Sequence, residues 1–304
     1  MGRRPKPRGR DVHGVVLLDK PLGLSSNQAL QRVKRLFKAN RAGHTGTLDP
    51  MATGLLPICL GEATKVAAYL TDADKAYTAR MQLGVNTTTG DQEGDVILER
   101  PVADSWKALL AEKLGSFTGE QEQVPPMYSA LKVNGTPLYK LAREGIEIER
   151  KRRTIRIHQL ELLALGGNWA EFYVSCSKGT YVRTLAEDMG EALGCGAHLT
   201  MLRRCAVAPY DNAAMLTLEQ IEALAEQGLD VLDASLQPPD TALQDWNTIE
   251  VTAEQMADIK YGKALAYAKL EEGWYRVLFA GQLLCLGEKC ADGMLYSRRL
   301  LHIV

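Results

Sequence analysis

Metal-binding motifs are missing from this sequence. Its six cysteines, at positions 59, 176, 195, 205, 285 and 290, form no CxxC pair, and its five histidines are scattered singly. Zinc sites need clustered cysteine and histidine ligands, so we expect no metal. Cysteines without a pairing pattern are typical of reduced thiols, and we therefore expect a cytoplasmic protein.

Long hydrophobic runs are also missing. No apolar stretch approaches the ~20 residues that a membrane helix needs, so we expect no membrane association. The N-terminal GRRPKPRGR is basic and lacks the apolar segment of a signal peptide, so we expect no export. We interpret residues 1–12 as a basic disordered tail, with contact between its cations and nucleic acid as the alternative.

Two enzyme signatures are absent. A dinucleotide-binding enzyme needs GxGxxG after a strand, but Gly194 and Gly196 follow a predicted helix and the third glycine is missing. A zinc base deaminase needs HxE and PCxxC, and the sequence contains neither. These absences predict a protein that uses no cofactor.

The charge is unevenly distributed along the chain. The formal net charge is −1, but residues 1–160 carry 25 basic against 17 acidic side chains, whereas residues 161–304 carry 11 against 20. Such asymmetry favours a polyanionic partner, because clustered cations displace counterions from phosphates. Chance scatter of exposed charges is the alternative.

The hydrophobic pattern predicts an α+β fold. The length of 304 residues and the 46% hydrophobic content suffice for one large core and a smaller domain. Apolar patterning predicts strands at 15–18, 55–60, 76–83, 154–165 and 170–176, and helices at about 26–37, 62–70, 104–117, 180–193 and 217–227. Residues 86–95 and 229–247 are interpreted as a loop and a linker. Few strands alternate with helices, so a mixed, mainly antiparallel sheet is expected.

The last sixty residues predict a separate small domain. A short helix at 253–261 precedes strands near 274–279, 282–286 and 294–303, which are separated by turn residues. So few residues of mostly β structure predict a small barrel.

One acid stands out in the stretch Gly43 to Lys65, GHTGTLDPMATGLLPICLGEATK. Asp49 lies among glycines and before Pro50, and the next carboxylate is Glu62. Glycine and proline predict a loop, and the apolar run after it predicts a buried strand. A carboxylate just before the start of such a strand could act as a nucleophile or base. A simple Asp-Pro turn has the same sequence pattern and is the alternative.

Arg183 falls in the first turn of the helix in SKGTYVRTLAEDMGEALG. A cation there opposes the helix dipole unless an anion lies nearby, and Asp49 is a candidate for that anion. Such a contact would orient the carboxylate and lower its pKa. An exposed arginine is the alternative.

Aromatic and basic residues are interleaved on a long excursion at about 121–153. Residues 133–135 predict a hairpin turn, and Thr136 is a candidate cap for a short helix. This composition suits RNA loops, whose bases stack and whose phosphates pair with cations; a charged surface insertion is the alternative.

Three stretches resemble a known family. GHTGTLDPMATGLLPICLGEATK, KGTYVRTLAEDMG and GAHLTMLRRCAV are similar to three motifs of the TruB family, the bacterial tRNA pseudouridine-55 synthases. The sequence departs from the family at Thr47, usually Ala, and at Met51, often Leu. The resemblance covers nearly the whole chain and is weakest in the last sixty residues.

The resemblance implies site residues. Asp49 is implied as the catalytic nucleophile, Arg183 as its ion-pair partner and Tyr77 as the ring that packs on the target base. The substrate-binding residues implied are His44, Tyr77, Tyr181 and Leu202. The RNA contacts expected from the same comparison and from charge are Lys65, Lys132, Arg150, Lys151, Arg152 and Arg153. Arg203 and Arg204 are expected to be phosphate contacts or surface charges.

The resemblance also implies domains and an activity. Residues 13–245 would form a pseudouridine synthase catalytic domain with an RNA-gripping insertion at about 121–153, and residues 246–304 a PUA-like RNA-binding domain. The enzyme would isomerise uridine-55 in the T arm of tRNA after flipping the base out, as a monomer without a protein partner. A non-catalytic tRNA-binding or tRNA-folding protein is the alternative.

Overall fold

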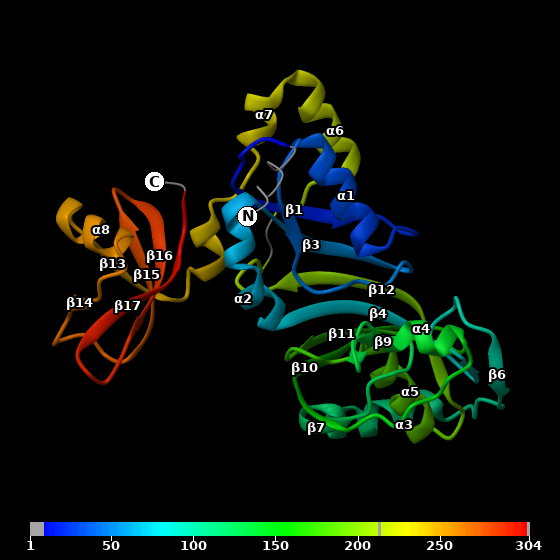
Figure 1. The fold of residues 1–304 in the computed structure, drawn as a ribbon. Helices are drawn as coiled ribbons and strands as arrows, with labels where there is room; N and C mark the ends of the chain where they lie inside the picture. Colours follow the sequence, from blue (N-terminus) through cyan, green and yellow to red (C-terminus); the bar gives the residue numbers. More distant parts are fainter. Residues whose placement is uncertain (1–8, 212–213, 303–304) are drawn as a thin grey trace.

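A mixed sheet forms the body of the molecule. The computed structural model describes residues 9–211 and 214–302 (Figure 1). The sheet order is β1-β3-β12-β4-β11-β10-β7, and β2 also pairs with β3. Its strands are β1 (Gly14–Lys20), β2 (Ala42–His44), β3 (Ala52–Leu60), β4 (Lys75–Leu83), β7 (Gly119–Gln123), β10 (Arg153–Leu165), β11 (Trp169–Cys176) and β12 (Ala197–Val207). Only the β3–β12 pairing within this path is parallel, so the predicted mainly antiparallel α+β sheet is confirmed.

The strands at the β1 end are buried on both faces. Val16 and Leu18 of β1 join one core, whereas Val15 and Leu17 join another. Because side chains alternate along a strand, the two cores lie on opposite faces of β1. The first core also takes side chains from α1 (Ser26–Leu36), α3 (Trp106–Lys113), α5 (Val182–Ala192) and α6 (Leu218–Gln227). The second takes them from η1 (Gly61–Lys65), α2 (Ala67–Asp72) and η3 (Pro239–Leu243).

Capping explains where two of these helices begin. Ser25 accepts a hydrogen bond from the backbone of Gln28, and the Gln28 side chain accepts one from the backbone of Ser25. Thr217 and Gln220 do the same at α6. This reciprocal arrangement satisfies two backbone N–H groups that a helix start otherwise leaves free.

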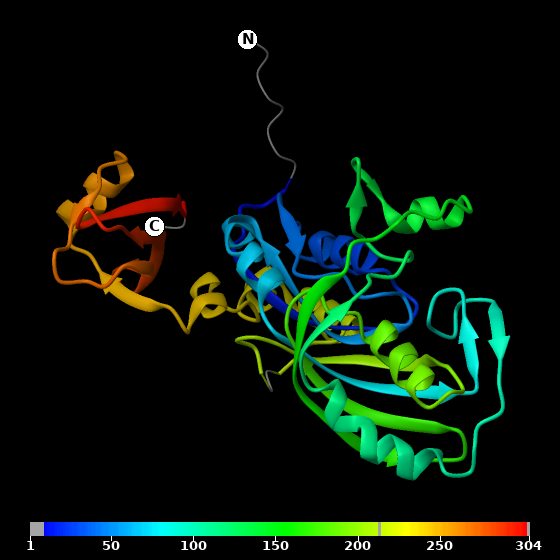
Figure 2. The ribbon, with the colours of Figure 1, turned by 90° about the horizontal axis from the view of Figure 1, so that it is seen from below.

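Two hairpins project from the sheet (Figure 2). The first pairs β5 (Val85–Thr87) with β6 (Val96–Glu99), so the predicted loop at 86–95 begins inside a strand. The second pairs β8 (Lys132–Val133) with β9 (Thr136–Pro137) and is followed by α4 (Leu138–Arg143). Asn134 and Gly135 have φ of 51° and 83°, as the predicted hairpin turn requires. The helix cap predicted at Thr136 is wrong, because Thr136 lies in β9 and the N-cap is Pro137.

Residues 124–152, here called the insertion, connect β7 to β10. These two strands are antiparallel neighbours, so both ends of the insertion leave the sheet side by side. Figure 2 shows its hairpin and α4 standing away from the sheet. The structure therefore contains the predicted excursion.

The C-terminal part is a small β domain with its own core. Its sheet order is β13-β15-β16-β17-β14, and the path has two ends, so the sheet curls without closing (Figures 1 and 2). Its elements are β13 (Asn247–Glu250), α8 (Ala253–Lys260), β14 (Leu265–Ala266), β15 (Gly273–Phe279), β16 (Gln282–Lys289) and β17 (Met294–Leu300). The predicted small C-terminal β domain is confirmed, as a curled half-barrel sheet and not as a closed barrel.

The two domains share an apolar junction. Leu283, Leu286 and Leu301 of the β domain join the second core of the catalytic domain. Tyr69 of α2 packs edge-on against Trp246, with ring centroids 4.7 Å apart, and Trp246 lies 5.4 Å from Trp274. The β domain is therefore packed against the face of β1 and β3 that carries the second core.

Two segment predictions are corrected. Residues 229–247, predicted as a linker, contain α7 (Leu229–Asp233) and η3. The prediction missed these helices because both are too short for a periodic signal. The predicted tail at 1–12 falls mostly outside the described residues. Within the described part of this segment, the backbone of Arg10 forms a β-bridge with Ala39. The Arg10 side chain binds Asp233, with Nη1 3.2 Å from Oδ1, so Arg10 is fixed to the catalytic domain.

Candidate active site

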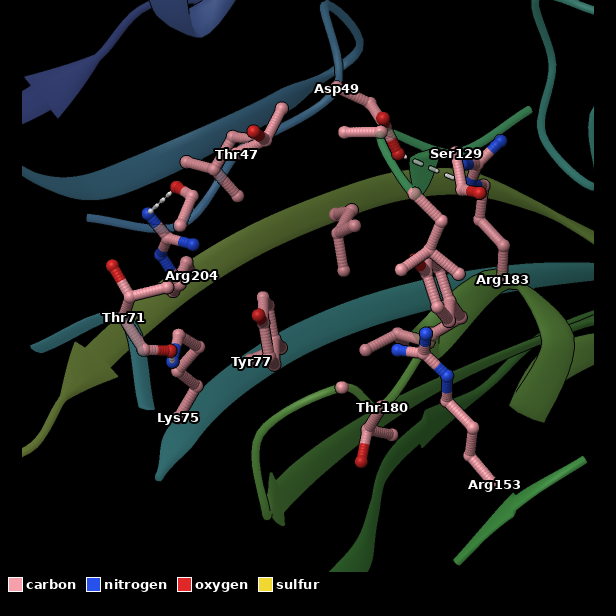
Figure 3. Close-up of a pocket in the computed structure, with 18 residues that line it drawn as sticks. Thr47, Asp49, Thr71, Lys75, Tyr77, Ser129, Arg153, Thr180, Arg183 and Arg204 are labelled. Carbon is pink, nitrogen blue, oxygen red and sulfur yellow. Dashed lines mark hydrogen bonds and ion pairs between the residues drawn. The ribbon is translucent and has the colours of Figure 1, made fainter. Parts of the chain in front are cut away.

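A pocket of about 320 Å³ opens beside the loop that precedes β3. It is lined by Gly46, Thr47, Leu48, Asp49, Thr71, Lys75, Tyr77, Ser129, Ala130, Leu131, Arg153, Gly179, Thr180, Tyr181, Val182, Arg183, Leu202 and Arg204. Figure 3 shows Asp49, Ser129 and Arg183 at one end, Arg204 and Lys75 at the other, and Tyr77 between them. Its volume is within the range of sites that take one small molecule or one nucleoside.

The backbone around Asp49 is fixed by buried side chains. The hydroxyl of Ser26 accepts from the Leu48 N–H at 2.7 Å and donates to the Leu48 carbonyl at 2.9 Å. Lys20, with no exposed surface, donates to the Pro50 carbonyl at 3.4 Å as well as to the carbonyls of Pro21 and Leu24 at 2.9 and 2.6 Å. The predicted Asp-Pro loop is therefore held against β1 and α1.

Arg183 uses all three of its nitrogens. Its Nε lies 3.1 Å from Oδ2 of Asp49, so the predicted pair is present. Its Nη1 lies 3.2 Å from Oδ2 of Asp91 and donates to the Thr89 carbonyl at 2.7 Å, while Nη2 donates to the Tyr128 carbonyl at 2.7 Å. A planar guanidinium with directed donors makes these contacts in a fixed orientation, which a lysine ammonium could not reproduce.

The pKa of Asp49 moves opposite to the prediction. Burial raises it above the ordinary aspartate value, and Asp91 raises it further, whereas Arg183 and Lys20 lower it. Removing a carboxylate from water disfavours its charged form, and here that effect exceeds the attraction of the arginine. The expectation of a lowered pKa is therefore wrong, because burial could not be read from the loop sequence.

Four implied substrate-binding residues have different surroundings. Tyr77 on β4 and Leu202 on β12 line the pocket and are 8% and 6% exposed. Tyr181 lines it at the N-cap position of α5. His44, at the end of β2, is not one of the described residues that line the pocket. Its buried Nδ1 has no hydrogen-bond partner within the described part of the chain.

Arg204 is buried beneath the pocket. Its side chain is 1% exposed and donates from Nε to the Leu55 carbonyl at 2.7 Å and from Nη2 to the Gly46 carbonyl at 3.2 Å. Close approach of its backbone requires Gly54 in β3, where a Cβ atom would lie 2.2 Å from the Arg204 carbonyl oxygen. The interpretation of Arg204 as a surface charge is wrong, and Arg203 instead binds Asp19, with N–O distances of 2.9 and 2.7 Å.

The predicted RNA contacts divide into three groups. Lys132, Lys151 and Arg152 are exposed, and Arg153 is exposed and lines the pocket. Arg150 is partly buried and donates to the Pro125 carbonyl at 3.2 Å, so it holds the insertion together. Lys65 contradicts the prediction, because its ammonium binds Glu62 and the Leu300 carbonyl, each at 2.5 Å, at the domain junction.

Sequence reasoning missed several members of the site. Asp91 lies in a polar, turn-rich segment in which nothing distinguishes it from its acidic neighbours, yet it is 2% exposed. Ser129 is 5% exposed and lines the pocket. Lys75 is 9% exposed and donates to carbonyls of Thr71 and Ala73. Lys20 is missed because a strand-ending lysine usually faces solvent.

Over residues 9–211 and 214–302, no group of three His, Cys, Asp or Glu side chains is arranged to hold a metal ion. Among the same residues, no helix is both long and apolar enough to span a membrane. Within these residues, the ionisable side chains that line the pocket are one carboxylate, three arginines, one lysine and two tyrosines.

Comparison with known proteins identifies related chains. Residues 34–182 match the TruB family pseudouridylate synthase N-terminal domain, and residues 183–244 match the tRNA pseudouridylate synthase B C-terminal domain. The chain is 56% identical over 298 residues to tRNA pseudouridine synthase B of Idiomarina loihiensis, covering 97% of this chain and 96% of that one. It is 48% identical over 303 residues to the protein of that name from Nitrosococcus oceani, covering 99% and 98%.

A solved structure shares the fold. A chain in the crystal structure of a Cbf5-Nop10-Gar1 complex is 26% identical, with a TM-score of 0.71, and the match covers 94% of this chain and 84% of that chain. With the two family matches and the full-length relatives, this shows that the chain belongs to the TruB family of tRNA pseudouridine synthases, which are isomerases.

Proposed function

We propose that the chain converts uridine-55 in the T arm of tRNA to pseudouridine, with Asp49 as the catalytic nucleophile. The observation that carries the proposal is the contact between Arg183 and Asp49 at the end of a nucleoside-sized pocket. The arginine orients one carboxylate oxygen and favours its ionised form. Membership of the family supports tRNA as the substrate, and the motif resemblance supports position 55.

The reaction needs the target base outside its stack. A uridine within the T loop must be flipped out, which costs a few kcal/mol of stacking and pairing. Stacking on an aromatic ring returns about 1–3 kcal/mol. Tyr77, between the two ends of the pocket, and Tyr181, two residues before Arg183 in sequence, are the rings placed for such contacts.

The isomerisation breaks the bond between C1′ and N1 of the uridine and forms a bond between C1′ and C5. Asp49 acts by attack at C1′, by attack at C6, or by assisting departure of the base through a glycal, and all three routes require its ionised carboxylate. After the new bond has formed, the hydrogen at C5 leaves as a proton, and N1, freed from C1′, takes up a proton, so the product is an isomer of uridine. No electron is gained or lost in this sequence.

The test is release of tritium from an unmodified tRNA transcript labelled at uridine C5, without added cofactor. Wild type should release tritium, and Asp49→Asn should reduce turnover to background while leaving tRNA affinity within about threefold. Position 55 is checked by sequencing the product. Near-normal turnover by Asp49→Asn would remove Asp49 from the mechanism.

A non-catalytic tRNA-binding or tRNA-folding function is the second candidate. The exposed cations of the insertion, Lys132, Lys151 and Arg152, would serve it equally well. It leaves the contact between Asp49 and the buried Arg183 without a purpose. Bound tRNA with no tritium release from wild type would favour this candidate.

A further inference from the structure

Gln123 is a buried amide at the point where the insertion begins. It is the last residue of β7, and its side chain is 4% exposed. A buried amide is costly unless its donor and acceptor are both satisfied. Here both groups bind the backbone of one residue: Oε1 accepts from the Tyr181 N–H at 2.8 Å, and Nε2 donates to the Tyr181 carbonyl at 3.1 Å.

This two-point contact adds to the first hydrogen bond of α5, in which the Tyr181 carbonyl accepts from the Leu185 N–H at 3.1 Å. Tyr181 is the N-cap of α5, with extended φ and ψ of −102° and 108°, and its own side chain makes no capping bond. Two hydrogen bonds to one peptide backbone restrict both its position and its rotation. They therefore fix the backbone from which the Tyr181 ring projects and the start of the helix that carries Arg183.

The same segment makes a second contact with this helix. Tyr128, five residues beyond Gln123, uses its carbonyl to accept from Nη2 of Arg183 at 2.7 Å. Pro125 and Pro126 lie between these two contacts and restrict the backbone there. Residues 123–128, the root of the insertion, thus hold Tyr181 through its backbone and Arg183 through its side chain.

The root is also bonded to the rest of the insertion. The Pro125 carbonyl of the root accepts from Arg150 on the returning segment at 3.2 Å. The carbonyl of Ser129, the residue that follows the root, accepts from the Tyr139 N–H of α4 at 3.1 Å. A displacement of the insertion would therefore act on the groups that orient Arg183.

We propose that Gln123 is a positioning residue, which aligns Tyr181 and, together with the Tyr128 carbonyl, joins the insertion to the Arg183–Asp49 pair. Gln123 does not itself line the pocket, and its two hydrogen bonds go to the backbone of Tyr181, so it acts through Tyr181 and α5. The inference rests on the proposed function, because the aligned groups are those assigned to catalysis. It predicts that Gln123 matters for the chemical step more than for tRNA affinity.

The experiment compares single-turnover tritium release and tRNA affinity for wild type, Gln123→Met and Gln123→Glu. Methionine keeps the length of the side chain and removes both hydrogen bonds. Glutamate keeps the acceptor but, when ionised, cannot donate to the Tyr181 carbonyl. The control is Gln159→Met, because Gln159 is an exposed glutamine on β10. Thermal unfolding confirms that each variant is folded at the assay temperature.

Both Gln123 variants should lower the single-turnover rate by about 10–100-fold, since a small misplacement of catalytic groups has effects of that size. Their tRNA Kd should stay within about twofold of wild type, and Gln159→Met should match wild type in both measurements. If Gln123→Met does not fold, the isosteric Gln123→Glu decides the outcome.

A folded Gln123 variant with a lower Tm and a wild-type rate would show a structural role alone and would overturn the inference. Equal losses in tRNA affinity and rate constant would also overturn it, because the residue would then act on binding. Wild-type protein that releases no tritium would remove the proposed function and this inference together. If wild type releases tritium, the proposed isomerase activity stands, and the Gln123 variants then test the positioning role alone.

Discussion

Asp91 places Oδ2 3.2 Å from Nη1 of Arg183, and both side chains are buried. The contact is made at a different nitrogen from the one that faces Asp49, so one guanidinium joins two carboxylates. Arg183 therefore lowers the pKa of Asp49, while Asp91 raises it. The balance between these charges and burial sets the pH at which Asp49 ionises.

Asp91→Asn should lower kcat/KM by on the order of tenfold, because Arg183 loses its second charged partner and its orientation. The variant should also shift the acidic limb of the pH profile to lower pH. Asp91 raises the pKa of Asp49, so removing its charge lowers that pKa. The measurement is kcat/KM against pH, with the exposed Asp95→Asn as control. An acidic limb that stays in place would exclude Asp49 as the ionising group.

Glu187→Gln should stabilise the protein near neutral pH. Burial raises the pKa of Glu187 to about 7 from an ordinary value of 4.5, so the folded state binds a proton that the unfolded state has released. Wild-type stability from this group is therefore lost as pH rises from about 4.5 to 7, by up to about 3 kcal/mol. Urea unfolding at pH 5 and pH 8 should show a variant advantage only at pH 8. An equal difference at both pH values would contradict the pKa shift.

Lys65→Met should act on stability and Lys132→Met on RNA binding. Lys65 binds Glu62, whose side chain is 6% exposed, so its loss should cost about 1–3 kcal/mol of unfolding free energy. Lys132 is exposed on the insertion, and its removal should reduce the slope of log K against log salt by about 1. Thermal unfolding and salt titration of tRNA binding measure both effects. A change in salt slope for Lys65→Met would return Lys65 to the RNA-binding surface.

Gly54→Ala should destabilise the fold by about 3 kcal/mol or more. The new Cβ atom would lie 2.2 Å from the Arg204 carbonyl oxygen, and φ at this position is 98°. Gly119→Ala is the matched control, because its φ is 96° but no atom lies within 4 Å of the added carbon. The control should cost about 1–2 kcal/mol, from backbone strain alone. Equal losses in urea unfolding would show that packing against β12 is not the cause.

Local patterns predicted most of the catalytic sheet. The strands at 76–83 and 170–176 lie within one residue of their predicted bounds, since one buried face imposes a period of two. The strand at 154–165 is also within one residue, although bulges interrupt its alternation. The short helices α7 and η3 escaped prediction because five residues are too few for a helical period. The Arg183–Asp49 contact could be predicted because the two motifs that contain these residues both resemble motifs of one family.

Contacts between distant polar side chains could not be predicted. Asp91 and Gln123 carry no local pattern that marks them as buried, and each is satisfied by a residue far away in sequence. Lys65 was assigned to RNA from its charge, whereas packing of the β domain decides its surroundings. The direction of the Asp49 pKa shift likewise depends on burial, which only the assembled fold determines.

The parallel pairing of β3 with β12 has a consequence for biosynthesis. Ala52, three residues after Asp49, is paired with Leu202, so the two walls of the pocket come from opposite ends of the catalytic domain. Contacts between segments so distant in sequence form late and slow folding. A nascent chain that has emerged only as far as the insertion already contains Asp49 and Tyr77 but lacks Arg183 and β12. It would therefore be inactive on the ribosome until β12 is released from the exit tunnel.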